Sequence, residues 1–298
     1  MNSFEIGVIL PGVGVQRGDG IDLREAARHA EDAGLDGVWH GDHLAVGGPT
    51  LDAPIALATA AAATARVRIG TSVLIPAIRP LAWAAKQVAT LQYVSGGRLV
   101  LGVGSGGGPG QWAAAGVPYA ERGPRTDSAL RLLPRLLAGE RTEVEGAAVE
   151  LAPSVPMPPV WVGNASLTAI RRAARLGDGW FPSLISPAQL AEGAARLAEL
   201  AAEHGRPAPV VAIGGTCALG TGVPSRAEIA SGIGGAYGRP VEEVIDIPLT
   251  GRPEEAAEKL AAYREAGARH AVIGIAGGDW RTQVELLAEV RKILHDTH

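Results

Sequence analysis

Short apolar segments alternate with longer helical ones along all 298 residues, and this alternation limits the possible fold more than any other feature. The segments expected to be strands are residues 5–10, 37–39, 67–74, 98–103, 160–162, 179–181, 209–219 and 270–275. The segments expected to be helices are residues 22–33, 52–64, 80–94, 125–138, 166–176, 187–204, 225–233, 253–266 and 280–294. Eight apolar strands separated by helices favour a closed parallel barrel over an open sheet.

We therefore predict an α/β protein in which residues 1–298 form a single (β/α)8 TIM-barrel domain. Residues 139–158 form a polar excursion after the fourth βα unit, and this small insertion has room for a hairpin. Helix ends are marked locally: Asp22 is placed to cap a helix that Gly34 closes, and Pro253 suits a first helical position.

Charge and cysteine content limit the partners and the compartment. The formal net charge is −4, which gives no electrostatic reason to expect nucleic acid or an anionic membrane as a partner. Cys217 is the only cysteine, so no internal disulfide can form, as is usual in a reducing compartment. The N-terminal residues do not resemble a secretory signal, and the alanine-rich run at 53–65 is shorter than the roughly 20 residues of a membrane span. We expect a cytoplasmic protein.

In a TIM barrel the chemistry gathers where the strands end, so those positions carry the candidate site. The second strand is followed by His40, Asp42 and His43, two imidazoles around one carboxylate. An imidazole can transfer a proton at neutral pH, and a carboxylate can orient it. The alternative is an aspartate that caps a turn beside a buried histidine.

The same residue types could bind a metal ion, as in a metal-dependent barrel hydrolase. The other histidines argue against this, because they lie on expected helices, at the tail, or at the opposite end of a strand: His29, His204, His270, His295 and His298. No spacing supplies further carboxylate ligands. We predict no metal site, and elemental analysis of the purified protein would test this.

The third and fourth strands end in small residues. Ser72 and Val73 lie at the end of the third strand, where small and hydroxyl side chains would let a flat ring approach the backbone. Taken alone, the segment is simply a core strand followed by a proline turn, and this interpretation is favoured. Residues 102–110 contain many glycines, which suit close contact with a ligand or simply form a mobile loop. No helix is expected to start within this segment and no acidic residue follows at the required position. Rossmann and Walker motifs are therefore rejected.

The fifth strand leads through Gly163, Asn164 and Ala165 to Ser166 at the start of a helix. Amides of a first helical turn, together with a hydroxyl, bind anions such as phosphate. Ordinary capping by Ser166 accounts for the same residues.

Two sets of conspicuous residues are interpreted as structural. Trp161 and Trp180 lie in strands and are expected in the core. Three arginines of the following helix are expected to form a solvated face, with one of them within reach of the barrel mouth: Arg171, Arg172 and Arg175.

The order of these segments resembles the bacterial luciferase-like superfamily, especially its coenzyme F420-dependent branch. The matching landmarks are Trp39-x-x-Asp42-His43-Leu44, Arg68-Ile-Gly70-Thr71-Ser72-Val73-Leu74-x-Pro76, Arg98-x-x-Leu101-Gly102-Val-Gly104-Ser-Gly106, Pro158-Pro159-Val-Trp-Val-Gly163, Ala173-Ala174-Arg175-Leu-Gly177-Asp178-Gly179-Trp180 and the helix that starts at Pro253. Each landmark is weak alone, but together they cover nearly the whole chain in the family's order.

The resemblance implies that F420, or alternatively FMN, lies across the barrel mouth. It also implies a non-proline cis peptide between Ser72 and Val73 behind the cofactor ring. Asp42 would then contact the ring and His43 would deliver a proton. The residues that would cradle the ring and phosphate are Ser72, Val73, Gly104, Ser105, Gly106, Gly107, Gly163, Asn164, Ala165 and Ser166.

Departures from the family pattern bear on the substrate. Sugar-phosphate dehydrogenases of this branch have a glutamate where this chain has Gly107, and a tryptophan where it has Gly47. These differences argue against glucose 6-phosphate dehydrogenase activity.

The resemblance therefore implies hydride transfer between F420 and an unidentified small organic substrate, with His43 as proton donor or acceptor. One alternative is an FMN-dependent two-component monooxygenase that uses O₂ and receives reduced cofactor from a separate flavin or F420 reductase. Another is a non-catalytic flavin-binding barrel. Relatives often pair through barrel helices, so a homodimer is expected.

Overall fold

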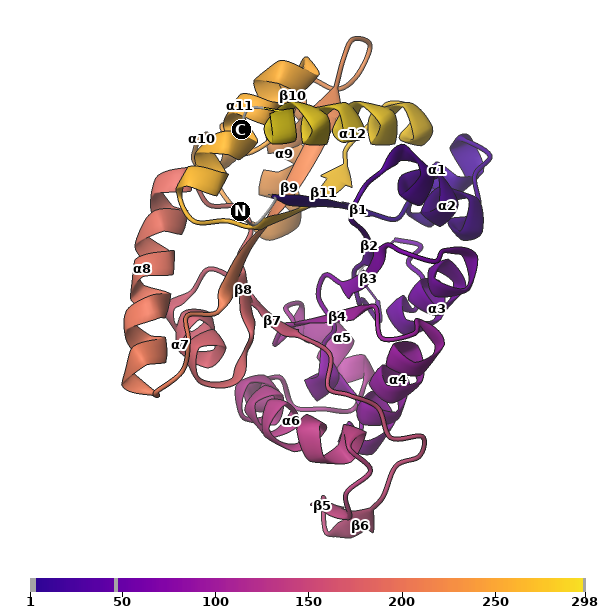
Figure 1. The fold of residues 1–298 in the computed structure, drawn as a ribbon, viewed down its shortest axis with the longest axis vertical. Coiled ribbons are helices and arrows are strands. Elements are labelled where there is room, and N and C mark those ends of the chain that lie inside the picture. Colours follow the sequence, from indigo (N-terminus) through magenta and orange to yellow (C-terminus); the bar gives the residue numbers. More distant parts are fainter. Residues whose placement is uncertain (1–3, 46–47, 297–298) are drawn as a thin grey trace.

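The computed structural model describes residues 4–45 and 48–296 and contains a closed barrel of parallel strands (Figure 1). Around the barrel the strands follow the order β9, β11, β1, β2, β3, β4, β7 and β8, and β8 pairs with β9 to close it. Their bounds are β1 Glu5–Ile9, β2 Gly37–His40, β3 Arg68–Thr71, β4 Leu99–Val103, β7 Val160–Gly163, β8 Gly179–Phe181, β9 Val210–Leu219 and β11 His270–Ile275. The predicted (β/α)8 fold and all eight predicted strands are confirmed.

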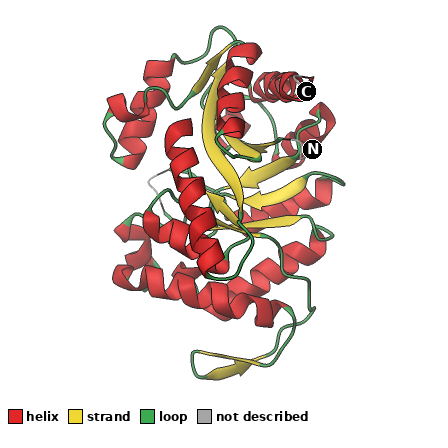
Figure 2. Ribbon diagram, turned by 60° about the vertical axis from the view of Figure 1, so that its left-hand side comes forward, coloured by secondary structure: helices red, strands yellow, loops and turns green. Residues whose placement is uncertain are grey.

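Helices surround the strands as an outer layer (Figure 2). Neighbouring contacts run from α2 through α3, α4, α6, α7, α8, α11 and α12 and back to α2. The bounds of these helices are α2 Leu23–Ala33, α3 Ala53–Ala63, α4 Leu81–Val94, α6 Arg122–Leu137, α7 Leu167–Leu176, α8 Pro187–Glu203, α11 Pro253–Glu265 and α12 Trp280–Asp296. The expected capping is present, because the Asp22 carboxylate accepts hydrogen bonds from the N–H groups of Arg24 and Glu25.

Two excursions leave the barrel. The predicted insertion after the fourth βα unit is a hairpin of β5 (Thr142–Val144) and β6 (Ala147–Val149), which projects at the foot of Figure 1. A second excursion follows β9 and contains α9 (Arg226–Tyr237), α10 (Val241–Val244) and β10 (Leu249–Gly251). This excursion has a small apolar core of its own. The helix that follows β9 in the outer layer is therefore α11, which contacts α8 and α12, and not α9.

The glycine-rich segment differs from the prediction, which was wrong, because a helix does start within it. Helix α5 spans Pro109–Ala114, with proline at its first position and Gly108 in a left-handed conformation before it. The predicted helix at 125–138 begins earlier, at Arg122. The short helices that were not predicted include α10 as well as α1 (Val13–Gly18) and the 3-10 helix η1 (Pro76–Ile78). A second 3-10 helix, η2, spans Tyr119–Glu121.

Large aromatic rings fill the barrel interior. Trp39 and Trp161 stack with ring centroids 5.1 Å apart, and Phe181 packs against both. Glycines on neighbouring strands make room for them, since an added Cβ at Gly70 would lie 2.1 Å from the Trp39 ring. Trp161 and Trp180 are both buried, as predicted.

Ion pairs tie the strands together at the N-terminal end of the barrel. The Glu5 carboxylate accepts hydrogen bonds from Arg68 Nε at 2.9 Å and lies 3.2 Å from His270 Nδ1. Burial acts to raise the pKa of Glu5, but the bonds from His270 and Arg68 outweigh it and lower the pKa to about 2. Glu5 is therefore stabilised as a carboxylate in the folded protein.

The Glu5→Gln variant should be less stable than the native protein near neutral pH, by about 1–2 kcal/mol after solvent screening is allowed for. Because the folded-state pKa lies below the ordinary 4.5, this contribution is present above pH 4.5 and disappears as the pH falls toward 2. Urea unfolding of both proteins between pH 7 and pH 2.5 would measure it. A stability difference that stays constant over this range would contradict the assignment.

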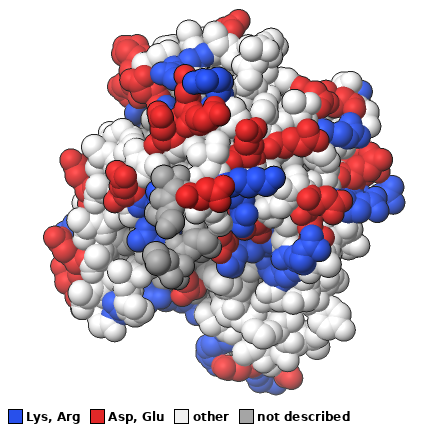
Figure 3. Space-filling model, turned by 45° about the horizontal axis from the view of Figure 1, so that its top comes forward, with Lys and Arg blue, Asp and Glu red and all other residues white. Residues whose placement is uncertain are grey.

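One face of the molecule carries mixed charge. Acidic and basic side chains are interspersed over the face in Figure 3 rather than gathered by sign. Within residues 4–45 and 48–296, no helix combines the length and apolar character needed to cross a membrane.

Candidate active site

The predicted site residues lie on one arc of the barrel mouth. Strands β2, β3, β4 and β7 are consecutive neighbours, so the segments that leave their C-terminal ends meet there. Hydrogen bonds join these segments: Ile75 N–H donates to Asp42, and Leu44 N–H donates to Gln111 Oε1. The residues on this arc that remain half-buried or exposed are His43, Ser72, Val73, Ser105, Gly106, Gly107, Asn164, Ala165 and Ser166.

Asp42 is buried, and protein groups already engage its carboxylate. Arg79 Nη1 and Nη2 each donate to one of its oxygens at 2.9 Å, and the backbone N–H of Ile75 donates at the same distance. Such a bidentate pair fixes the segment after β2 against the segment after β3. Contact between Asp42 and a cofactor ring stays a prediction.

The two histidines beside Asp42 differ in environment. His40 is buried, and its Nδ1 lies 2.8 Å from the carbonyl oxygen of Gly41. A carbonyl only accepts, so Nδ1 carries the proton of a neutral ring. Burial lowers the pKa of His40, although the bond to Gly41 opposes this, which keeps the ring uncharged. His43 is exposed at the mouth.

Gly41 keeps space open between His43 and the third strand. An added Cβ at Gly41 would lie 3.4 Å from the carbonyl oxygen of Ser72 and 3.6 Å from Nε2 of His43. The His43 ring and the Ser72 carbonyl oxygen therefore both border the space beside Gly41. The peptide bond between Ser72 and Val73 is cis, as the resemblance implied.

The glycines after β4 and β7 surround the Val73 side chain. An added Cβ at Gly104 would lie 2.4 Å from Val73 Cγ2, and one at Gly163 would lie 3.0 Å from Val73 Cγ1. At Gly107, by contrast, an added Cβ would meet no atom of the described residues within 4 Å. Packing against Val73 therefore requires glycine at positions 104 and 163. In the segment after β4, Gly107 at the exposed end has the open space that we predicted for contact with a ligand.

The Gly104→Ala variant should be destabilised by about 1–3 kcal/mol, because its methyl group would overlap Val73. It should also weaken cofactor uptake if Val73 forms the wall of the site. Urea unfolding and cofactor titration would measure the two effects. Gly107→Ala is the matched control and should change stability by less than about 0.5 kcal/mol. The Val73→Ala change in the Gly104→Ala background should restore stability, and a failure to do so would show that the overlap is not the cause.

The segment after β7 presents the start of helix α7. Asn164 has a left-handed backbone with φ of 87°, and its carbonyl accepts a hydrogen bond from Trp180 Nε1 at 2.9 Å. Its side chain accepts from the N–H of Ser166, whose own hydroxyl accepts from Ala169 N–H. The predicted capping by Ser166 is confirmed. Anion binding at the same helix end stays a prediction.

Several contributors to this arc were not predicted. Arg79 and Gln111 connect the loops, and Gln111 Nε2 also donates to the carbonyl of Gly107 at 2.6 Å. Arg172 is buried rather than solvated as part of a helix face. It pairs with Asp127 at 2.6 Å and donates to the hydroxyl of Ser105 at 3.2 Å. It is thus the arginine that reaches the mouth.

Two further observations concern ligands. Within the described parts of the chain, no three His, Cys, Asp or Glu side chains come together in a group able to hold a metal ion. A cavity of about 450 Å³ lies elsewhere on the mouth, between α9 and the ends of β9 and β11. Gly47, where the family pattern has a tryptophan, lies outside the described residues.

The fold and this arc define a class of protein: a (β/α)8 barrel that gathers polar side chains and glycines on one arc of its C-terminal mouth. Comparison with known proteins identifies the family. The sequence model of the family described as luciferase-like monooxygenase matches residues 5–230. The chain belongs to the luciferase-like monooxygenase family.

Sequence relatives include several F420-dependent glucose-6-phosphate dehydrogenases. The protein of this name from Rhodococcus erythropolis is 30% identical over 314 residues, which cover 89% of this chain and 90% of that protein. The one from Beutenbergia cavernae is 38% identical over 192 residues, which cover 56% of each protein. An uncharacterised Mycobacterium tuberculosis protein is 35% identical, and the match spans 58% of its length. The chain therefore spans little more than half the length of several curated relatives.

Solved structures confirm the fold. An F420-dependent secondary alcohol dehydrogenase in complex with an F420–acetone adduct superposes with a TM-score of 0.83 at 18% identity, covering 98% of this chain and 99% of the other. The monooxygenase RslO1 from Streptomyces bottropensis superposes with a TM-score of 0.76 at 20% identity, covering 98% and 99%.

Proposed function

We propose that this protein is an oxidoreductase that transfers a hydride between coenzyme F420 and a small organic substrate, with His43 as proton donor or acceptor. The observation that carries the proposal is the position of His43, an exposed imidazole that borders the same space beside Gly41 as the Ser72 carbonyl, on the arc where the resemblance places the cofactor ring. The names of the sequence relatives support F420 as the cofactor.

The residues on the arc fit a planar ring with a phosphorylated tail. The space that a Cβ would fill at Gly41 and at Gly107 leaves backbone accessible to a flat ring. The exposed start of α7, with Asn164 and Ser166, is neutral and presents the positive end of a helix dipole, which suits a phosphate. Ser72, Val73, Ser105 and the segment from Gly163 to Ser166 would hold the cofactor.

The roles of the chain's own residues follow from their contacts. When bound, the cofactor supplies two-electron hydride chemistry. His43 holds or accepts the proton that accompanies the hydride at the substrate. Asp42 acts through Arg79 and Ile75 by fixing the loop that bears His43, and its contact with the ring is part of the proposal.

Titration of the protein with F420 and with FMN, each followed through its own fluorescence, tests the cofactor assignment. We expect saturable uptake of F420 and much weaker uptake of FMN. Preferential uptake of FMN would instead favour the two-component monooxygenase, which needs a separate reductase. Uptake of neither cofactor would overturn the proposal.

We also propose that the protein is a cytoplasmic homodimer. Ile55 on α3 and Trp83 on α4 are both 69% exposed, and these two helices contact one another. Exposed apolar side chains on adjacent barrel helices are typical of a subunit contact. Sedimentation of the native protein and of a Trp83→Glu variant would test this, and a native monomer would contradict it.

A further inference from the structure

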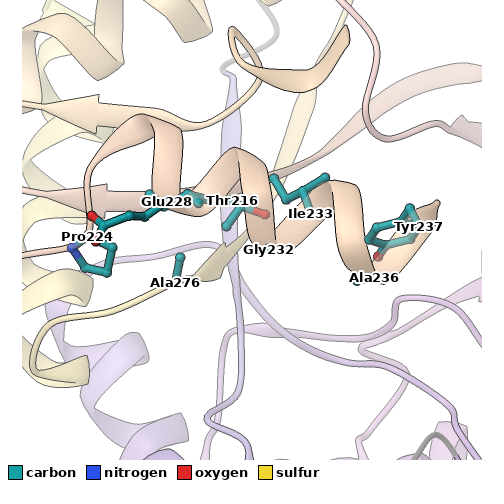
Figure 4. Close-up of a pocket in the computed structure, with 9 residues that line it drawn as sticks. Thr216, Pro224, Glu228, Gly232, Ile233, Ala236, Tyr237 and Ala276 are labelled. Atoms are coloured by element: carbon teal, nitrogen blue, oxygen red, sulfur yellow. The ribbon is translucent and has the colours of Figure 1, made fainter. Parts of the chain in front are cut away.

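The cavity at the barrel mouth extends along one side of helix α9. Its walls are formed by Thr216, Pro224, Glu228, Ile229, Gly232, Ile233, Ala236, Tyr237 and Ala276. Figure 4 shows Pro224 and Glu228 near the start of α9, Tyr237 at its end, and Thr216 and Ala276 of the barrel beside the helix. None of these residues belongs to the predicted cofactor set, so the cavity is a separate part of the mouth.

The walls of this cavity are mostly apolar, with two hydroxyl-bearing residues, Thr216 and Tyr237, and one acid. Among the described residues that line it there is no lysine or arginine, and Glu228 is the one that carries a charge. The Glu228 carboxylate accepts hydrogen bonds from the backbone N–H of Ser225 at 2.8 Å and from its hydroxyl at 2.7 Å. These bonds hold the pKa of Glu228 below its ordinary value, so the acid is ionised at neutral pH.

We infer that this cavity is the substrate pocket and that it admits an uncharged, apolar organic molecule while disfavouring phosphorylated sugars. The inference rests on the proposed function and names the substrate class of that site. The volume of about 450 Å³ is in the range of small-molecule pockets. A phosphate placed there would meet the Glu228 carboxylate, and none of the described lining residues is a cation that could pair with it.

Helix α9 offers a matched pair of glycines for testing the pocket. Gly232 lines the cavity, whereas Gly235 does not. Both are exposed, and an added Cβ at either would meet no atom within 4 Å in the part of the chain that the structure describes. A phenylalanine at residue 232 can therefore occupy the cavity, while one at residue 235 changes the same helix without filling it.

Fluorescence titration with prodan, a neutral naphthalene ketone, measures binding in the cavity. The native protein should bind it, Gly232→Phe should bind it at least about tenfold more weakly, and Gly235→Phe should stay within about twofold of the native protein. Equal binding by the two variants, or no binding by the native protein, would overturn the inference.

The charge of Glu228 can be tested without loss of its helix cap. Ser186 and Gln189 of α8 form the same capping box with a neutral amide, so Glu228→Gln should keep α9 capped. Removal of the charge should raise affinity for the anionic dye anilinonaphthalene sulfonate about two- to fivefold and leave prodan affinity unchanged. Unchanged affinity for the anionic dye would contradict the electrostatic selection.

F420 titration of the same variants separates the two proposals. If only Gly232→Phe loses prodan binding and no variant takes up F420, the cavity binds apolar molecules as inferred, and the proposed hydride transfer with F420 is contradicted. If the protein takes up F420 but prodan binding does not depend on residue 232, the proposed function stands and the assignment of the substrate pocket is contradicted.

Discussion

Replacing His43 with alanine should lower turnover about 100- to 10,000-fold, because the proton at the substrate would lose its donor or acceptor. Uptake of F420 should change by less than about twofold, since the side chain is exposed and Asp42 still fixes the loop through Arg79. The measurement is the rate of change of F420 absorbance with an electron-poor carbonyl or unsaturated compound from a substrate panel, beside a fluorescence titration of the cofactor.

Leu44→Ala is the matched control for the His43 variant. Leu44 is the next residue and is 56% exposed, and its backbone rather than its side chain makes the bond to Gln111. Its turnover should remain within about threefold of the native value. A His43→Ala protein that binds cofactor normally and keeps full turnover would remove His43 from the mechanism.

Replacing Glu31 with alanine should lower the free energy of unfolding by about 3–5 kcal/mol. The buried Glu31 carboxylate, in the last turn of α2, accepts hydrogen bonds from the backbone N–H groups of Ala65, Arg66 and Val67 at 2.6–3.1 Å. These N–H groups precede β3 and would lose their acceptor in a partly buried turn. Urea unfolding measures the loss.

Asp32→Ala provides the control for Glu31, because it removes a carboxylate from the next position, where the side chain is exposed. It should change stability by less than about 0.5 kcal/mol. Glu31→Gln keeps one carbonyl acceptor and should fall between the two. If Glu31→Ala and Asp32→Ala are equally stable, the carboxylate does not hold the turn.

The strands and most helices could be predicted because their signals are local. A strand such as β8 is bounded by glycine and proline and is apolar throughout, and Asp22 and Ser166 cap their helices through atoms two or three residues away. Such signals depend on neighbouring residues, which a sequence displays directly. The position of α9 could not be predicted in this way, because its sequence is helical like that of α11. The helix that covers the barrel is α11, and this is decided by its packing against α12 and α8.

The candidate site was predicted in its residues but only partly in their roles. The sequence marks His40, Asp42 and His43 as one titratable group, yet no local pattern indicates that Asp42 pairs with Arg79, 37 residues further along the chain. The same holds for Arg172, which looks like a solvated residue until its helix packs beside Asp127.

By itself, the sequence determined the alternation of strands and helices, the closed barrel that follows from it, and the chemical types gathered at the strand ends. The tertiary structure decided that His40 is buried and neutral, that Asp42 is held in an ion pair, and that His43 is left accessible. It also decided that the absence of a side chain at Gly104 makes room for Val73. The physical reason is that burial, pairing and steric room depend on atoms brought together from distant parts of the chain, whereas periodicity and capping depend on neighbours.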